Sequence, residues 1–126
     1  MKILLAEDDP SIHAIATMAL SRVGGHQIVA ARDGTEVLKL IEAEKPDLIL
    51  LDVMMPKLDG FETCSQLKSK PETRDIPVIF LTAKAQLTEI QNGMNLGAIG
   101  YILKPFDPMT LHKQIEEVIA NHAKAA

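Results

Sequence analysis

The chain has little of several features that mark particular classes of protein. Among its 126 residues there are one cysteine, no tryptophan and 3% aromatic residues. A single cysteine, Cys64, excludes an intramolecular disulfide and fits a reducing compartment. Cys64 stands at apolar spacing between Phe61 and Leu67, which indicates a buried packing residue and not a reactive thiol.

Long apolar runs and an excess of positive charge are also missing. The chain turns acidic at Glu7, too early for the core of a signal peptide, and no apolar run approaches the length of a membrane span. A net charge of −4 gives no electrostatic footprint for nucleic acid. We therefore expect a cytoplasmic protein with no direct nucleic-acid contact and no membrane contact.

What is present indicates one α/β domain spanning residues 1–126, since a chain of this length with 47% hydrophobic residues buries one core of ordinary size. Short apolar runs alternate with segments of helical spacing, and continuous apolarity is typical of parallel strands buried on both faces. The expected strands are Ile3–Ala6, Ile28–Ala30, Leu48–Leu51, Val78–Leu81 and Tyr101–Leu103. The expected helices contain Ile12 to Val23, Val37 to Ile41, Phe61 to Leu67, Leu87 to Leu96 and Leu111 to Ile119. Five strands alternating with five helices predict a doubly wound sheet.

Local signals set the helix boundaries. Asp9-Pro10 is typical of an N-cap followed by proline in the first turn, and Gly24-Gly25 of a helix end. Asp33-Gly34, Asp59-Gly60 and Asp107-Pro108 indicate later helix starts. Asn92-Gly93 is expected to interrupt the Leu87 to Leu96 helix and to make it comparatively mobile.

A different polar residue follows each of four apolar runs. Glu7-Asp8-Asp9 follow the first run, Asp52 the third, Thr82 the fourth and Lys104 the fifth. Because parallel strands end at one edge of a sheet, these groups are expected to meet there. Clustered carboxylates need a proton or a cation between them, and Mg²⁺ prefers such oxygen ligands. The set therefore predicts a site for a divalent cation and a phosphoryl group.

Each of these residues has a plainer alternative. Asp9 is expected only to cap the following helix, whereas Glu7 and Asp8 are not needed for that cap. Asp52 is either a turn former or a carboxylate nucleophile that forms an aspartyl phosphate. Thr82 offers a hydroxyl to a phosphoryl oxygen or caps a helix. Lys104 is either a surface lysine or a cation that binds phosphoryl oxygens. The bond between Lys104 and Pro105 can be cis, which would hold the lysine side chain in a fixed direction.

Together with Met55-Pro56-Lys57-Leu58-Asp59-Gly60, these residues resemble the receiver domain of two-component response regulators, a CheY-like domain. The resemblance covers essentially the whole chain. It implies a flavodoxin-like sheet of order 2-1-3-4-5. It also implies that Asp52 accepts a phosphoryl group from a sensor histidine kinase or a histidine phosphotransfer protein. Such a domain is a signalling receiver that promotes its own phosphorylation and dephosphorylation, and not an enzyme.

The same resemblance assigns the remaining roles. Asp8, Asp52 and the backbone carbonyl of Met54 would ligate Mg²⁺, with Glu7 acting through a water. The acidic pair is assigned to Glu7-Asp8 and not to Asp8-Asp9, because the apolar Ile12 stands four positions after Asp8.

Thr82 and Lys104 would bind phosphoryl oxygens, and Tyr101 would change rotamer as Thr82 moves. Phosphorylation would then switch the face of the fourth helix, fifth strand and fifth helix for a downstream protein. Gly24 resembles an insertion relative to the family, and Ile99-Gly100 replaces a polar pair. Apolar Met54 is expected to limit access of water to the acyl phosphate.

Other classes fit less well. A flavin carrier needs a hydroxyl- and glycine-rich loop where Glu7-Asp8-Asp9 stand, and a haloacid-dehalogenase phosphatase needs an Asp-x-Asp pattern that Met54 breaks. A pseudo-receiver that acts as a phosphorylation-independent adaptor is the surviving alternative. The four histidines show no metal-ligand spacing, and His13 and His112 are expected on exposed helix faces.

Overall fold

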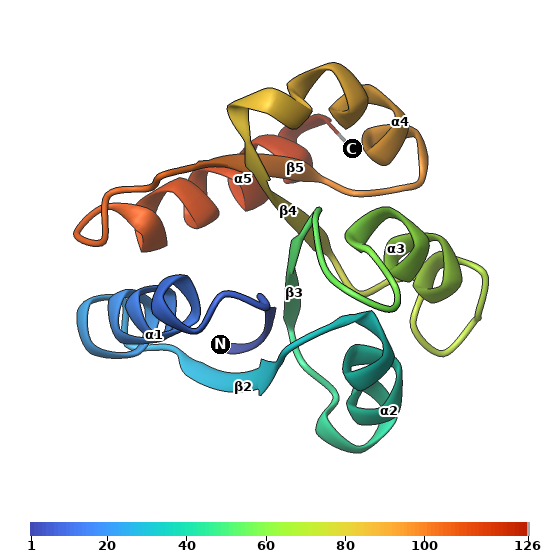
Figure 1. Cartoon of the computed structure of the whole chain (residues 1–126), viewed down its shortest axis with the longest axis horizontal. Coiled ribbons are helices and arrows are strands. Elements are labelled where there is room, and N and C mark those ends of the chain that lie inside the picture. Colours follow the sequence, from blue (N-terminus) through green and yellow to red (C-terminus); the bar gives the residue numbers. More distant parts are fainter. Residues whose placement is uncertain (126) are drawn as a thin grey trace.

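Five parallel strands form one sheet in the order β2-β1-β3-β4-β5 (Figure 1), which confirms the predicted fold class. The computed structural model describes residues 1–125. The strands are β1 (Lys2–Ala6), β2 (Gln27–Ala31), β3 (Leu48–Asp52), β4 (Val78–Ala83) and β5 (Gly100–Lys104). The helices are α1 (Pro10–Met18), α2 (Gly34–Glu44), α3 (Gly60–Lys68), α4 (Ile90–Asn95) and α5 (Leu111–Ala125). Two shorter segments accompany them, a π-helical turn η1 (Ala19–Val23) and a 3₁₀ segment η2 (Lys84–Glu89).

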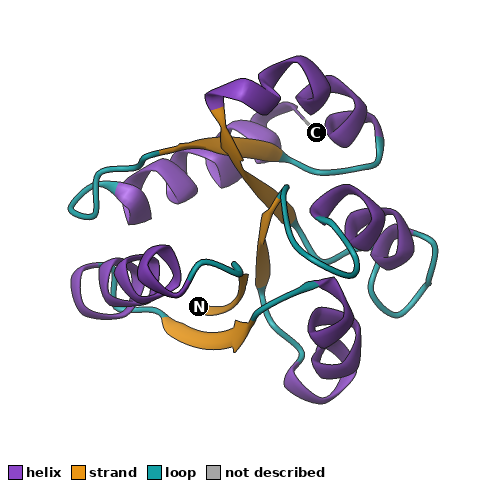
Figure 2. Ribbon diagram, viewed as in Figure 1, coloured by secondary structure: helices purple, strands orange, loops and turns teal. Residues whose placement is uncertain are grey.

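Both faces of the sheet are covered, as the continuous apolar runs predicted. Helices α1 and α5 pack on one face, and α2, α3 and α4 pack on the other (Figures 1 and 2). Within β1 the side chains alternate between the two cores, with Ile3 on the α1 side and Leu4 on the α2 side. Cys64 of α3 is fully buried, as predicted. Within the described residues, no helix is long and apolar enough to cross a membrane.

The start and end of the first helical segment follow the sequence signals. One carboxylate oxygen of Asp9 accepts hydrogen bonds from the backbone N–H groups of Ser11 and Ile12, at 2.9 and 3.3 Å. Asp33 and Asp59 cap α2 and α3 in the same way. The segment ends as a π-helical turn in which Gly24 N donates to Ala19 O at 3.1 Å. Because a π-turn spans one residue more than an α-turn, it accommodates the additional Gly24.

One helix boundary and one prediction of exposure were wrong. Helix α5 begins at Leu111 and not after Asp107-Pro108, because Asp107 first holds a separate turn. In that turn its carboxylate accepts from Met109 N at 2.9 Å, and its carbonyl accepts from Leu111 N at 3.0 Å. The prediction that His13 and His112 lie on exposed helix faces was also wrong, since both side chains are half-buried.

The predicted interruption at Asn92-Gly93 is wrong as well. Helix α4 continues through Gly93, and the change of helix type falls earlier, between Glu89 and Ile90. A Cβ at Gly93 would lie 2.5 Å from the ring of Phe61 and 2.7 Å from that of Phe80. These rings pack edge to face, with centroids 5.2 Å apart. Glycine is therefore required by close packing against two aromatic rings, and it does not break the helix.

Candidate functional site

The polar residues at the strand ends meet at the carboxyl edge of the sheet. Asp52 ends the central strand β3, Lys104 ends the edge strand β5, and Thr82 lies between them near the end of β4. In the sheet register Thr82 pairs with Leu103, and Ala83 pairs with Lys104. Parallel pairing thus brings residues that are far apart in the sequence to one point.

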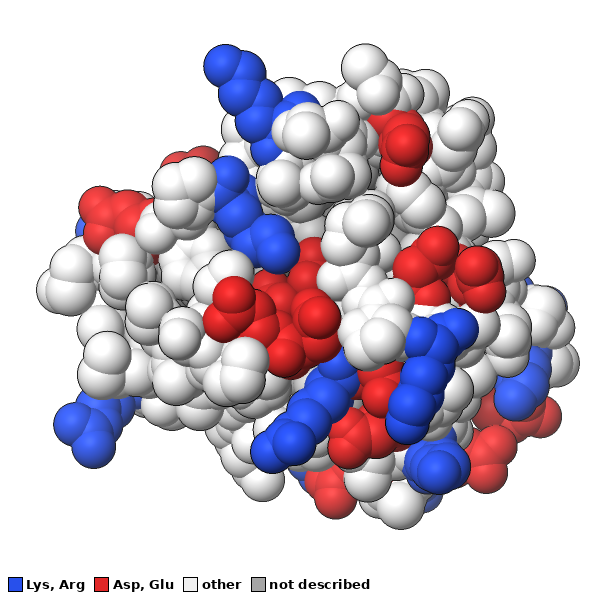
Figure 3. All heavy atoms as spheres, viewed as in Figure 1, with Lys and Arg blue, Asp and Glu red and all other residues white. Residues whose placement is uncertain are grey.

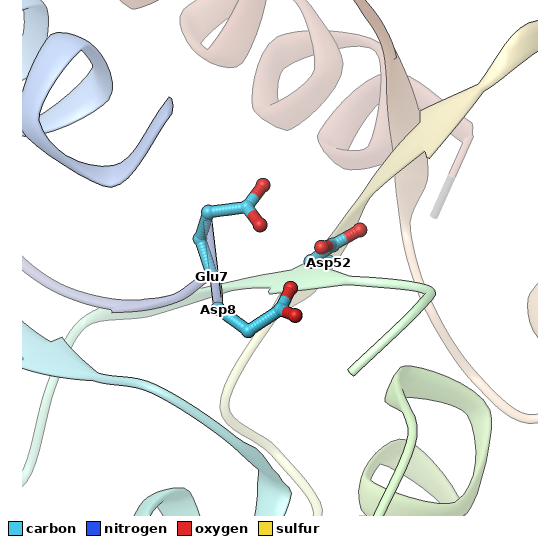
Figure 4. A group of neighbouring side chains, drawn as sticks. All are labelled: Glu7, Asp8 and Asp52. Carbon is cyan, nitrogen blue, oxygen red and sulfur yellow. The ribbon is translucent and has the colours of Figure 1, made fainter. Parts of the chain in front are cut away.

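Three carboxylates form the centre of this site. Glu7, Asp8 and Asp52 each offer an oxygen, and these oxygens lie within 4.8 Å of one another. Figure 4 shows Glu7 and Asp8, on the connection after β1, directed toward Asp52. Glu7 and Asp52 are 1% and 2% exposed, whereas Asp8 is open to solvent. Figure 3 shows acidic atoms gathered near the centre of this face, bordered by Lys and Arg side chains.

Lys104 is the cation of the site. Its Nζ donates to Asp52 Oδ1 at 3.0 Å and to Glu7 Oε1 at 3.2 Å. Two backbone N–H groups support the same carboxylates, since Asp9 N donates to Glu7 Oε2 at 3.1 Å and Met54 N to Asp52 Oδ1 at 3.3 Å. Asp9 itself caps α1, as predicted, and lies outside the carboxylate group.

The electrostatics reflect an excess of negative charge. Burial, followed by the hydrogen bond and the charge of Asp52, raises the pKa of Glu7 to about 8. Burial opposes the charge on Lys104, but Asp52 and Glu7 outweigh it and raise the pKa of the lysine. The ammonium of Lys104 contacts two of the three carboxylates, so negative charge remains in excess and the protonated form of Glu7 is favoured. A divalent cation fits this donor set, which is composed of carboxylate oxygens.

The remaining predicted residues surround this centre. Thr82 is fully buried, and its hydroxyl donates to the carbonyl of Ala83 at 3.2 Å and to none of the carboxylates. The bond between Lys104 and Pro105 is cis. Tyr101 is 42% exposed on the edge strand β5, and the Met54 side chain is 59% exposed.

Sequence reasoning missed one supporting residue. Gly60, interpreted as a helix start and as the last residue of the motif after Asp52, packs against the backbone of the central strand. A Cβ there would lie 2.4 Å from the carbonyl oxygen of Asp52 and 2.9 Å from Cα of Val53. Gly60 N also donates to Val53 O at 3.0 Å. The Asp59-Gly60 dipeptide could have indicated this role. Its glycine begins α3 and also allows α3 to pack closely on the backbone of Asp52.

The structure therefore combines a sheet of order 2-1-3-4-5 with buried acids, a hydroxyl and a lysine at its carboxyl edge. The sequence model of the response regulator receiver domain matches residues 3–116 of this chain. The chain therefore belongs to the response regulator receiver family, as the sequence predicted.

Individual relatives agree with this assignment. The alkaline phosphatase synthesis transcriptional regulatory protein PhoP of Bacillus subtilis is 41% identical over 125 residues, which cover 99% of this chain and 51% of PhoP. The chain spans about half the length of the curated relatives it matches.

Solved structures show the same fold. The chemotaxis response regulator CheY4 of Vibrio cholerae has a TM-score of 0.85 at 32% identity, covering 93% of this chain and 97% of CheY4. The receiver domain of sensor histidine kinase PA1611 of Pseudomonas aeruginosa has a TM-score of 0.83 at 28% identity, covering 94% of this chain and 97% of that domain. A magnesium ion is coordinated in the active-site cleft of the PA1611 domain.

Proposed function

We propose that the chain is the phosphoacceptor receiver of a two-component phosphorelay and that Asp52 takes the phosphoryl group. The observation that carries this proposal is the position of Asp52, a buried carboxylate at the end of the central strand, 3.0 Å from the Lys104 ammonium and beside two further acids. The donor is a sensor histidine kinase or a histidine phosphotransfer protein. We further propose that residues 1–126 act as one receiver domain.

Mg²⁺ is the proposed cofactor, and the residues present fit it. Asp8, Asp52 and the backbone carbonyl of Met54 would hold the ion, with Glu7 beside them. The supporting observation is the group of three carboxylates, in which oxygens of Glu7, Asp8 and Asp52 lie within 4.8 Å of one another. The raised pKa of Glu7, which burial and the neighbouring Asp52 cause, agrees with a preference for added positive charge. When bound, the ion supplies positive charge for the carboxylates and for the oxygens of the transferring group.

The chain's own residues perform the transfer. A carboxylate oxygen of Asp52 attacks the phosphorus of the donor phosphohistidine, and the P–O bond forms as the P–N bond breaks. The electron pair of the broken bond stays with the leaving imidazole. Lys104 pairs with Asp52 before transfer and with a phosphoryl oxygen afterwards. The Thr82 hydroxyl turns from the Ala83 carbonyl toward a second phosphoryl oxygen.

The response to phosphorylation would involve the two strands that carry Thr82 and Lys104. Thr82 and Lys104 lie on β4 and β5, and Tyr101 is exposed on β5. Movement of the two phosphoryl-binding side chains would shift Tyr101 and reshape the face of α4, β5 and α5, where a downstream protein binds. The curated relatives are named transcriptional regulators and are about twice as long as this chain. In our proposal, residues 1–126 contact proteins and not nucleic acid.

Intact mass measurement after incubation with Mg²⁺ and acetyl phosphate tests the proposal. Wild type is expected to gain the mass of one phosphoryl group, and the gain should disappear in Asp52→Asn or with EDTA. Asp59→Asn is the matched control, since Asp59 caps α3 nearby without joining the carboxylate group. A wild type that folds, binds no Mg²⁺ and gains no mass would refute the proposal and favour the alternative of a phosphorylation-independent adaptor.

A further inference from the structure

A second group of titratable side chains, sharing no residue with the carboxylate site, meets around Gly24. A Cβ on Gly24 would lie 2.7 Å from Cβ of His112 and 3.1 Å from Cδ2 of His26. His112 belongs to the first turn of α5, and His26 joins η1 to β2. Glycine at this point therefore lets two imidazoles from distant parts of the chain approach one small space.

Each of these rings has a buried nitrogen without a hydrogen-bond partner among the described residues. The nitrogens are Nε2 of His26 and Nδ1 of His112. Nε2 of His26 is bonded to the Cδ2 atom that a Cβ on Gly24 would approach. Since neither nitrogen has a partner among the described residues, no hydrogen-bond acceptor stabilises a charge at either position.

The hydrogen bonds of His26 favour its neutral form. The terminal ammonium of Met1 lies 3.1 Å from His26 Nδ1. Because an ammonium has only donors, Nδ1 must supply a lone pair, and the ring proton resides on Nε2. A proton added at Nδ1 would destroy this bond and place a second positive charge against the ammonium.

We propose that His26, packed beside His112 at Gly24, forms an acid-sensitive junction, which holds the start of α5 against η1 while the His26 imidazole is neutral and loosens when that ring takes up a proton. The inference concerns the packing of α5 and does not depend on phosphorylation of Asp52.

All but one of the groups that act on His26 lower its pKa. Burial lowers the pKa of His26, and the amine of Met1 and the His112 ring lower it further, whereas the Glu116 carboxylate on α5 raises it. A histidine with a lowered folded-state pKa contributes stability that is complete above its unfolded pKa and is lost as the pH falls below it. The sensitive range therefore begins near the ordinary histidine pKa of about 6.5 and extends to lower pH.

Urea unfolding of the full chain at about pH 7.5 and about pH 5.5 tests the junction, because histidine titrates between these values. The His122→Gln variant is the matched control, since His122 is exposed on the same helix. The titration of Glu7 is common to all four proteins, so the differences between them isolate the junction. Relative to His26→Gln, acidification should lower the urea midpoints of wild type and His122→Gln, and by equal amounts. Glu116→Gln, which removes the favourable carboxylate, should be lowered further than wild type. Equal changes in all four proteins would overturn the proposal.

A measurement on wild type covers the case in which His26→Gln does not fold. Ring signals of the histidines, followed by NMR from about pH 8 to pH 5, give a titration midpoint for each. We expect the His26 midpoint to lie below that of exposed His122, and amide exchange at Gly24 to accelerate in acid beyond its intrinsic pH dependence. A His26 midpoint at or above that of His122 would refute the junction.

Discussion

Replacing Glu7 by Gln gives a direct test of the electrostatics at the site. Gln has the shape of a protonated Glu but does not titrate. Burial beside Asp52 raises the pKa of Glu7 to about 8, so the folded metal-free protein keeps a proton that the unfolded chain has lost. Glu7 is only 1% exposed, so solvent screening is small. Stability is therefore complete below the unfolded pKa of Glu7 and declines as the pH rises toward about 8.

The size of the effect follows from one proton. Over the affected range, the free energy of unfolding of wild type falls by about 1.4 kcal/mol per pH unit relative to Glu7→Gln. From about pH 5.5 to about pH 8 the difference amounts to roughly 3 kcal/mol in favour of the variant. Loss of the bond from Asp9 N to the second carboxylate oxygen shifts the variant by a constant amount and leaves this slope unchanged.

Urea unfolding in EDTA at the two pH values measures the slope, and added Mg²⁺ then narrows the difference between the two proteins at about pH 8. With the ion at one hundred times its dissociation constant, wild type gains about 2.7 kcal/mol. The variant, which has lost one of three carboxylates, gains less. The reasoning fails if the two proteins differ by the same amount at both pH values in EDTA.

Three further predictions concern single side chains. Gly93→Ala should lower the free energy of unfolding in urea by about 1 to 3 kcal/mol, because its Cβ would overlap the Phe61 ring; the same change in a Phe61→Leu background should cost less, and equal costs would contradict the packing argument. Burial raises the pKa of the Cys64 thiol to about 11, so iodoacetamide at about pH 8 should label it only after unfolding; rapid labelling without urea would show that the thiol is accessible. Met54→Asn should shorten the lifetime of phosphorylated Asp52 severalfold, measured as loss of the added mass, and an unchanged rate would contradict a role for Met54 in limiting water.

That the polar residues meet at one edge of the sheet could be predicted, because their positions depend on the order of the strands and on where each strand ends. Asp52 and Lys104 each follow an apolar run, and parallel strands place such residues at one edge. The caps of the first three helices were also predictable, since Asp before Pro or Gly is a local signal. In these places the local sequence and the tertiary structure require the same residue.

The features that could not be predicted depend on contacts across the fold. Glycine usually weakens a helix, so the sequence at Gly93 indicated a break. The structure shows that Gly93 is needed because the Phe61 and Phe80 rings pack closely against it. Lys104 is shared between Asp52 and Glu7, and no spacing in the sequence specifies two partners. The direction of the Thr82 hydroxyl toward the Ala83 carbonyl is likewise set by side-chain rotation.

The arrangement of the strands separates the proposed acceptor from the groups that would respond to it. Asp52 ends β3, which has a neighbouring strand on each side and is buried throughout, so its carboxylate is held in place. Lys104 ends β5, an edge strand paired only with β4, and edge strands resist displacement less because one side is unpaired. A phosphoryl group on Asp52 would compete with the Asp52 and Glu7 carboxylates for the same ammonium. Since the central strand is paired on both sides and buried, we expect the adjustment to fall on β5 and on exposed Tyr101.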